Sequence, residues 1–286
     1  MAELKTVGLS HVYSAGTPFE NIALNDINIS IPQGQLIGLL GHTGSGKSTL
    51  VQHFNALLQP TSGQIFIGDE DINESRKTRY EVRFRVGLVF QYPEYQLFEE
   101  TVRADIAFGP KNMGLSEAEI NERVVEAAGF AGVSQELFDK SPLDLSGGQK
   151  RRIAVAGVIA MRPEVLILDE PCAGLDPEGS NKILQNLCDY RKASGATVII
   201  ISHNMDDIAR IADRLIVLEK GAVRMDGTPE EVFSEPETLR SLGLAVPKAT
   251  EIAMALKERG VDLNAPVYTH DQLVAAILRV KEAAKC

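Results

Sequence analysis

The sequence has no tryptophan, only three cysteines and no long apolar run. Cys172, Cys188 and Cys286 share no CxxC-type spacing, which argues against a disulfide framework and against a zinc site. The longest purely apolar stretches, such as residues 165–168 and 198–201, are far shorter than the ~20 residues of a membrane-spanning helix. We therefore expect a chain that does not itself cross a membrane.

Basic residues are also in short supply. The chain has 29 Lys and Arg against 39 Asp and Glu, which gives a formal net charge of -10. A surplus of acidic groups opposes non-specific attraction to nucleic acid or to an anionic bilayer. Residues 1–5 lack the basic region that precedes the apolar core of a secretory signal. We predict no nucleic-acid partner and a cytoplasmic location.

The length and composition suit one large α/β domain with a small appendage. The 286 residues are 44% hydrophobic and 24% charged, which are ordinary values for globular proteins. Short apolar or alternating runs predict strands, and the later, continuous runs are typical of strands buried on both faces of a parallel sheet. The predicted strands are residues 5–9, 27–31, 36–40, 64–67, 86–90, 165–168, 197–201 and 215–218.

Helical patterns dominate two other parts of the chain. Helical spacing of apolar residues between about 92 and 160 predicts a helical subdomain inserted into the sheet. Residues 248–258 and 270–283 form two amphipathic patterns around a turn region. They predict a small α-helical C-terminal domain over residues 226–286, after a main domain over residues 1–225.

The strongest local signal is a glycine-rich run that follows the predicted strand 36–40 and fits G-x-x-x-x-G-K-[ST]. Its glycines let backbone amides turn around phosphate oxygens, and the N-terminus of the following helix favours an anion. Lys47 would reach the β- and γ-phosphates of a nucleotide, and Ser48 offers a hydroxyl to Mg²⁺. The candidate ATP-binding residues here are Gly41, His42, Thr43, Gly44, Ser45, Gly46, Lys47, Ser48 and Thr49.

Two carboxylates, Asp169 and Glu170, follow the apolar strand 165–168, at the edge where α/β sheets place their ligands. Asp169 suits the coordination shell of Mg²⁺. Glu170 is then placed to polarise the water that attacks the γ-phosphate. Many strands end in acidic residues, so the pair indicates a catalytic site only because the phosphate loop is also present. Together the two signals predict ATP hydrolysis.

A second candidate phosphate site is the run Leu145, Ser146, Gly147, Gly148 and Gln149, where another helical segment begins. Exposed amides at a helix N-terminus, with a serine hydroxyl beside them, attract phosphate. One domain has no use for two such sites. We therefore predict a head-to-tail dimer, in which this run of one subunit closes over the γ-phosphate held by the other.

Taken together, the three motifs resemble those of ABC transporter ATP-binding subunits over about residues 1–225. The resemblance implies a P-loop NTPase fold of α/β class, with a RecA-like core, an antiparallel β subdomain and the inserted helical subdomain. Tyr13 then resembles the aromatic residue that stacks on adenine, and Gln91 the glutamine that contacts Mg²⁺ and senses the transmembrane partner. His203 resembles the switch histidine at the γ-phosphate, the catalytic companion of Glu170. The loop through which the subunits communicate corresponds to Gly174, Leu175 and Asp176.

Residues 41–58, 90–98 and 203–207 narrow the resemblance to the ATPases of energy-coupling factor (ECF) importers, particularly the second of their two paired A subunits. This implies an ATP- and Mg²⁺-dependent translocase subunit, peripheral at the cytoplasmic face of the membrane, that energises uptake of vitamins or transition-metal ions. The implied partners are a second ATPase subunit, an integral scaffold (T component) and a substrate-binding membrane S component. A heterodimer is favoured and a homodimer is possible. The C-terminal helical domain is expected to serve dimerisation.

Rival functions would require other residues or other spacings. The nearest alternative is the ATPase subunit of another ABC importer or of an exporter. A DNA-repair ATPase would need a long coiled-coil insertion, for which the segment between Gly41 and Leu145 is too short. A ribosome-acting protein usually carries two cassettes, and a scaffold that does not hydrolyse ATP would be expected to lack Glu170 or His203. No residue is expected to contact the transported solute, so the sequence does not show whether the solute is a vitamin or a metal ion.

An acidic stretch beside Gln91 suggests one further hypothesis. Glu94, Glu99 and Glu100 either face a groove that receives basic coupling helices of the scaffold, or form a solvated acidic face. A departure from the family is Cys172, where Thr or Ala is more usual. Its small side chain beside the acidic pair should leave hydrolysis intact.

Overall fold

The buried apolar runs form a six-stranded sheet at the centre of the computed structural model, which describes residues 3–263 and 265–283. The strand order is β11-β10-β4-β9-β8-β7, and all neighbours are parallel except β10 and β11. β4, β7 and β9 are buried along their whole length, because the sheet is covered on both faces. The strands are β4 (Leu36–Leu40), β7 (Val86–Val89), β8 (Val165–Asp169), β9 (Thr197–Ile201), β10 (Arg214–Glu219) and β11 (Ala222–Gly227).

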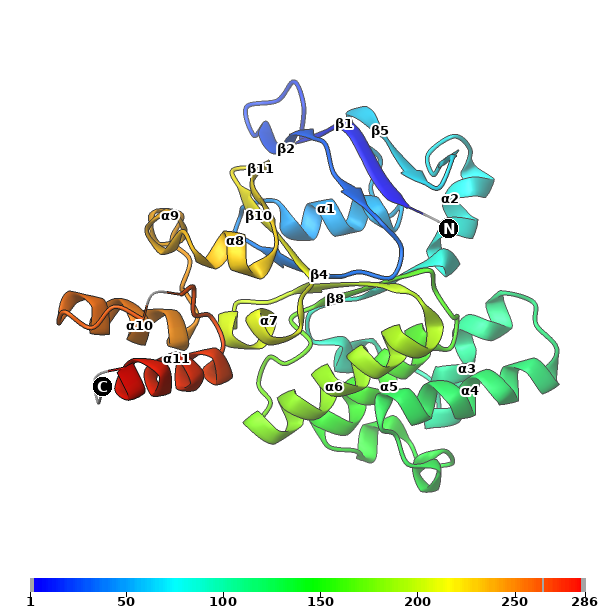
Figure 1. The fold of residues 1–286 in the computed structure, drawn as a ribbon. Coiled ribbons are helices and arrows are strands. Elements are labelled where there is room, and N and C mark those ends of the chain that lie inside the picture. Colours follow the sequence, from blue (N-terminus) through cyan, green and yellow to red (C-terminus); the bar gives the residue numbers. More distant parts are fainter. Residues whose placement is uncertain (1–2, 264, 284–286) are drawn as a thin grey trace.

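A smaller antiparallel sheet covers one side of helix α1 (Lys47–Phe54), whose other side faces the central sheet (Figure 1). Leu50 and Phe54 of α1 pack in one apolar core with Ile65 and Ile199, which come from the two sheets. The antiparallel order is β2-β1-β5-β6, with β3 also paired to β1. These strands are β1 (Leu4–Tyr13), β2 (Asn21–Ile27), β3 (Ser30–Ile31), β5 (Ser62–Ile67) and β6 (Glu70–Asp71).

Between β7 and β8 the chain leaves the central sheet and builds a helical insertion. Its three longer helices pack on one another, and Ile106, Val124 and Ile153 join the apolar core of the sheet's other face (Figure 1). This is the insertion predicted for about residues 92–160. Its elements are η1 (Pro93–Gln96), α3 (Val102–Asn112), α4 (Glu117–Ala131), η2 (Gln135–Leu137), η3 (Pro142–Asp144) and α5 (Gly147–Ile159).

The C-terminal boundary differs from the prediction. A boundary after residue 225 cuts β11, which continues to Gly227. Phe233 and Leu239, in the two helices that follow β11, are buried in the main core, so these helices also belong with the main domain. A separate small apolar core begins only at Ala249 and includes Leu273. The remaining helices are α2 (Arg76–Arg85), α6 (Pro177–Ser194), α7 (Met205–Ile211), α8 (Pro229–Phe233), α9 (Pro236–Ser241), α10 (Lys248–Glu258) and α11 (His270–Ala283).

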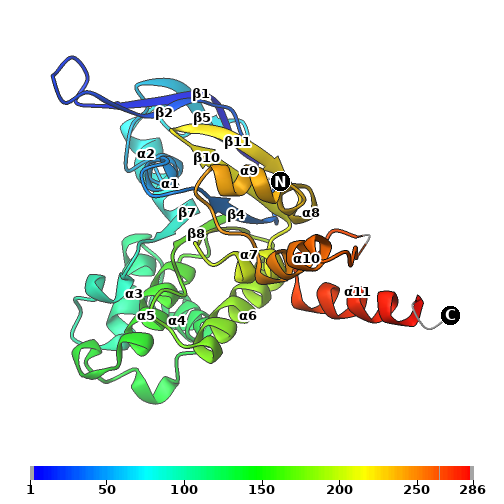
Figure 2. The same cartoon turned by 90° about the vertical axis from the view of Figure 1, so that its left-hand side faces the viewer.

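Helices α10 and α11 project to one side of the molecule, as Figure 2 shows. Both follow the residue ranges predicted from amphipathic periodicity. Along α11, the side chains of Val274, Ile277 and Leu278 are exposed at helical spacing. Within the described part of the chain, no helix combines the length and the apolar character needed to span a bilayer.

Candidate functional site

The loop between β4 and α1 requires glycine at several positions. Gly41, Gly44 and Gly46 have φ values of 150°, 82° and 102°, which side chains rarely adopt. A Cβ on Gly41 would lie 2.4 Å from Oγ of Ser45, and one on Gly46 would lie 2.6 Å from the carbonyl oxygen of Ala23. Helix α1 therefore starts from a left-handed Gly46 with no side-chain cap, which leaves its first amides without a side-chain acceptor.

Lys47, the first residue of α1, is buried and held across the loop. Its Nζ donates hydrogen bonds to the carbonyl oxygens of Gly41 at 2.6 Å and His42 at 3.0 Å. Burial lowers the pKa of Lys47, against the opposing charges of Asp169 and Glu170. The ammonium is thus placed between the loop and the acidic pair, where an anionic group would gain the most from it.

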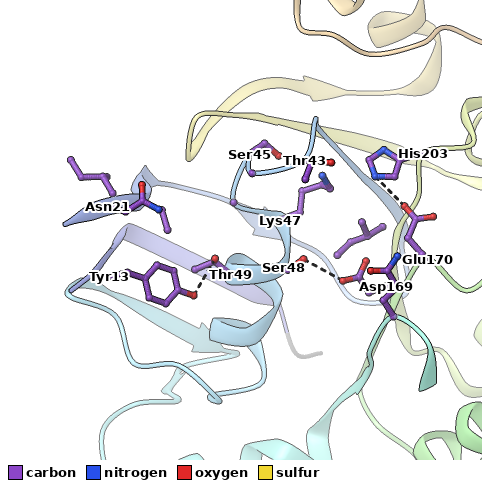
Figure 3. Close-up of a pocket in the computed structure, with 16 residues that line it drawn as sticks. Tyr13, Asn21, Thr43, Ser45, Lys47, Ser48, Thr49, Asp169, Glu170 and His203 are labelled. Carbon is purple, nitrogen blue, oxygen red and sulfur yellow. Dashed lines mark hydrogen bonds and ion pairs between the residues drawn. The ribbon is translucent and has the colours of Figure 1, made fainter. Parts of the chain in front are cut away.

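A cavity of about 430 Å³ brings the separated motifs together (Figure 3). Residues 43–49 of the phosphate loop line one side, and residues from the ends of β7, β8 and β9 line another. These strands are parallel neighbours, so their carboxyl ends meet at one edge of the sheet. All residues predicted to bind the nucleotide or Mg²⁺ within this chain line the cavity, except Gly41 and His42. The carbonyl oxygens of these two residues accept hydrogen bonds from Lys47.

Oxygen donors gather at one place in this cavity. Ser48 Oγ donates to Asp169 Oδ2 at 3.3 Å, and the Gln91 amide lines the same space. Burial raises the pKa of Asp169, while the Ser48 hydrogen bond and the charge of Lys47 act in the opposite direction. Oε1 of Glu170 is buried without a hydrogen-bond partner. Hydroxyl, carboxylate and amide oxygens are the donors that Mg²⁺ takes, so these residues fit that ion.

Among the acids that line the cavity, Glu170 has the most strongly shifted pKa. Burial, and next the neighbouring charge of Asp169, raise its pKa to about 7. Its backbone is in the left-handed region with φ 53°, and its amide donates to the carbonyl oxygen of Ile201 at 3.0 Å. Strained backbone held by its surroundings is common at functional sites. A carboxylate with a pKa near neutrality is suited to accept a proton from water.

His203 lies beside this carboxylate. Its Nε2 is 3.4 Å from Oε1 of Glu170, without the geometry of a hydrogen bond, and the two side chains point toward each other (Figure 3). Burial, and next the charge of Lys47, lower the pKa of His203. The imidazole is therefore mostly neutral near pH 7 and keeps one N–H to donate.

Tyr13 lies at the opposite end of the cavity from Glu170 (Figure 3). Its hydroxyl is 3.3 Å from Oγ1 of Thr49, and its ring makes an edge contact with His11 at 4.5 Å between centroids. Tyr13 is paired with Asn21 across the β1–β2 hairpin, which explains why Asn21 also lines the cavity. Its neighbours 22 and 23 and Ile201 line it too, and none of these was predicted. The place of residues 21–23 depends on the hairpin register, which has no signal in the local sequence, whereas Ile201 ends a strand that was predicted.

The predicted signature run lies elsewhere. Ser146 is the N-cap of α5, where its Oγ accepts from the amide of Gln149 at 3.4 Å and Oε1 of Gln149 accepts from the amide of Ser146 at 3.0 Å. Ser146 and Gly147 are exposed, whereas Leu145 and Gly148 are half-buried. No residue of the run lines the cavity of its own chain.

The predicted communication loop also lies outside the cavity lining. Gly174 is left-handed at φ 74°, and Leu175 packs against the main core. Asp176 caps α6, accepting from the amide of Gly179 at 2.8 Å. The loop begins four residues after Glu170, so the catalytic edge and this loop share one short stretch of backbone.

The acidic residues after Gln91 differ in their surroundings, since Glu100 is exposed and Glu99 is half-buried. Glu94 is paired with Arg151, with an Nη2–Oε1 distance of 3.0 Å, and its side chain is only 15% exposed. Glu94 is therefore neutralised within the chain, which contradicts the hypothesis for this residue. A different acid, Asp105, lines a neighbouring groove of about 300 Å³ with Phe98, and its Oδ2 is buried without a partner.

Comparison with known proteins places these features in context. A family model described as ABC transporter matches residues 24–173. The energy-coupling factor transporter ATP-binding protein EcfA2 of Clostridium tetani is 51% identical over 286 residues, which cover 99% of this chain and 99% of that protein. The protein of the same name from Caldanaerobacter subterraneus subsp. tengcongensis is 52% identical over 282 residues, again with 99% of each covered.

Solved structures are similar as well. One is cbiO1 from Clostridium perfringens, described as part of the ABC transporter complex cbiONQ, with a TM-score of 0.74 and 43% identity over 87% of this chain and 97% of that chain. Another is a dimeric ATP-binding cassette in a post-hydrolysis state with ADP and Pi, with a TM-score of 0.71 and 26% identity over 79% of this chain and 98% of that chain. The core of the chain therefore has the fold of these cassettes.

Proposed function

We propose roles for the residues of the cavity. The chain belongs to the ABC transporter family and, within it, to the energy-coupling factor transporter ATP-binding proteins. It is an ATP-binding and ATP-hydrolysing subunit that energises import. The observation that carries the assignment of roles is the cavity in which Lys47, Glu170 and His203 meet at one sheet edge. Phosphate contacts belong at the loop, and the adenine belongs at Tyr13 on the opposite end.

ATP binding uses groups that the chain already holds in place. The uncapped first amides of α1 and the Lys47 ammonium receive the β- and γ-phosphates. The ring of Tyr13, 38% exposed, offers a face for stacking on the base. Ser48, Asp169 and Gln91 would hold Mg²⁺, which supplies charge neutralisation on the phosphates when bound.

Hydrolysis depends on Glu170. Its carboxylate accepts a proton from the attacking water, while neutral His203 donates its N–H toward the γ-phosphate. A buried carboxylate whose pKa is close to 7 is a stronger base than an exposed one, so the same burial that disfavours its charge supports its role.

The site is completed by a second ATPase subunit. Ser146 to Gln149 lie outside the cavity of their own chain, and Ser146 and Gly147 are exposed, which supports their action on the nucleotide of the partner. The partner is a different subunit in the favoured arrangement and an identical one in the alternative. Gly174, Leu175 and Asp176 would contact it near the catalytic edge. The exposed apolar face of α11 offers a further surface for this pairing.

A membrane scaffold (T component) and an S component complete the proposed transporter, with this chain peripheral at the cytoplasmic face. Asp105 and the exposed Phe98 lie in a mostly apolar groove, lined also by Arg83, and we take this groove as the seat of a coupling helix with a basic side chain that reaches Asp105. Opposite charge raises the affinity for such a helix, and the buried Asp105 Oδ2 would gain a partner. The cargo belongs to the vitamin or transition-metal-ion class.

Purification from membranes tests this function directly. A tagged full-length chain is expected to copurify with a second ATPase, an integral scaffold and a small solute-binding membrane protein, and to drive ATP-dependent uptake in vesicles. Copurification with another kind of transmembrane protein, without the S component, would favour another ABC importer or an exporter. Asp105→Asn is expected to weaken the scaffold contact, while Asp139→Asn, an exposed position in the same subdomain, leaves it intact.

A further inference from the structure

Arg151 is the most buried arginine in the helical insertion, and it connects three segments that are far apart in the sequence. It lies five positions after Ser146 on α5. Its guanidinium donates to both carboxylate oxygens of Glu94, at 3.0 Å from Nη2 and 3.3 Å from Nε, with side chains that are 6% and 15% exposed. Its Nη1 donates to the carbonyl oxygen of Ala173. The planar guanidinium makes these contacts in one fixed geometry.

The contacts continue to the catalytic carboxylate. The amide of Ala173 donates to the carbonyl oxygen of Glu170 at 3.1 Å. Glu94 is in η1, three residues after Gln91. A continuous set of hydrogen bonds therefore joins η1, the beginning of α5 and the backbone of Glu170. Each member is held by its neighbours, so a shift of η1 would be felt at Glu170.

We propose that Arg151 is a positioning residue that couples the segment after Gln91 to the Glu170 backbone and to the α5 N-terminus. The inference rests on the proposed function, in which that segment faces the membrane scaffold. Movement of η1 on the scaffold then changes both the placement of the general base in this chain and the orientation of the Ser146 end offered to the partner's nucleotide.

A purely structural ion pair is the competing explanation, and the two differ in what they predict. Truncating one partner of a buried pair leaves an unpaired charge and destabilises the fold, whereas replacing both partners by neutral groups of similar volume is usually tolerated. The informative variant is therefore Glu94→Gln with Arg151→Met. It removes the coupling and leaves no buried charge behind.

The experiment uses the complete complex, purified in detergent and in vesicles, with hydrolysis measured at varied ATP with and without the membrane components. The double variant is expected to lower scaffold-stimulated kcat by roughly tenfold, a usual size for coupling between two sites. KM for ATP and the Tm of the purified chain should stay near the wild-type values. Arg151→Lys, which keeps the charge but not the fork, should give an intermediate kcat.

A matched control is the exposed pair Arg162 and Glu126, which joins the turn before β8 to α4 of the helical insertion with an Nη2–Oε2 distance of 2.6 Å. Arg162→Met with Glu126→Gln should leave kcat and KM unchanged. Wild-type stimulation in the Glu94→Gln, Arg151→Met complex overturns the inference, as does a change confined to KM or a loss that the control shares. If the membrane components do not stimulate even the wild-type chain, the proposed function fails. The wild-type result therefore tests the proposed function, and the variant result tests the role of Arg151.

Discussion

Helices α1 and α5 both begin at a glycine-rich run, yet their N-termini are built in opposite ways. Helix α1 starts from a left-handed Gly46 with no side-chain cap, and its first residue, Lys47, is buried at the wall of the cavity. Helix α5 starts from Ser146 at the exposed surface, and its capping box with Gln149 satisfies the amides of Ser146 and Gln149. The first end is open to an anion, whereas two amides of the second are already bound by its own side chains.

This difference explains why one chain holds only half of each proposed site. An uncapped helix end inside a cavity can bind phosphate without help, because its amides have no competing acceptor. A capped, exposed end gains from phosphate only when a second subunit brings the nucleotide close to it. Substitutions at either end test this difference, and the expected effects decrease from the catalytic base to the dependence on pH.

Changing the base on the α1 side should have the largest effect. Glu170→Gln keeps the phosphate loop but removes the proton acceptor, so kcat should fall by about 100-fold or more. Affinity for ATP should be preserved. Phosphate release and titration with a fluorescent nucleotide measure the two quantities. Glu178→Gln, an exposed position on α6, is the control, and normal steady-state turnover in Glu170→Gln contradicts the assignment.

Changing the cation of the α1 end should affect binding instead. Lys47→Ala removes the buried ammonium that faces the acidic pair, so ATP affinity should fall by roughly 30-fold or more, the cost of truncating one partner of a buried charge pair. Calorimetric titration of the purified chain measures it, with the exposed Lys77→Ala as control. Unchanged affinity in Lys47→Ala would place the phosphates elsewhere.

The α5 end can be compared with a helix that has the same cap. Ser146 on α5 and Ser116 on α4 each form a capping box. Ser146→Ala and Ser116→Ala should each lower the free energy of unfolding by about 1 kcal/mol. Only Ser146→Ala should also slow hydrolysis in the ATPase pair, by roughly tenfold, as for a lost hydrogen bond to a charged group. Equal rates for both variants would remove Ser146 from the site.

The smallest expected effect is the dependence on pH. Because the pKa of Glu170 is raised to about 7, the carboxylate is protonated below that pH and cannot accept a proton from water. The value of kcat/KM should therefore rise by about fourfold between pH 6.5 and 8, following the ionised fraction of the free enzyme. The residual activity of Glu170→Gln should be flat over this range. A kcat/KM that falls as the pH rises would contradict the role of Glu170 as the base.

Much of the fold was predictable because strands that are buried on both faces have continuous apolar sequences. β4 and β9 have the predicted bounds, since helices cover both faces of the sheet. β11 was missed because it is short, has no fully buried residue and ends in Asp226 and Gly227, and α2 was missed because it has few apolar residues. These elements take their conformation from their neighbours.

The candidate site was predictable where the motifs end parallel strands. Gln91, Glu170 and His203 meet because β7, β8 and β9 are adjacent, a consequence of the sheet rather than of local sequence. Asn21 depends on the register of a hairpin, and the Glu94–Arg151 pair spans 57 positions of the chain. Contacts of that kind have no local signature, so the sequence pointed to Glu94 but not to its partner.

The central claim is that each ATP is hydrolysed between two subunits. The most direct test places Ser146→Arg in this chain, assembles it with the second ATPase subunit, and follows a photo-cross-linkable ATP analogue on each subunit separately. Hydrolysis of the nucleotide bound to the partner should stop, while this chain still binds its own nucleotide. Loss of hydrolysis only on this chain's own nucleotide, or on neither, would contradict the account.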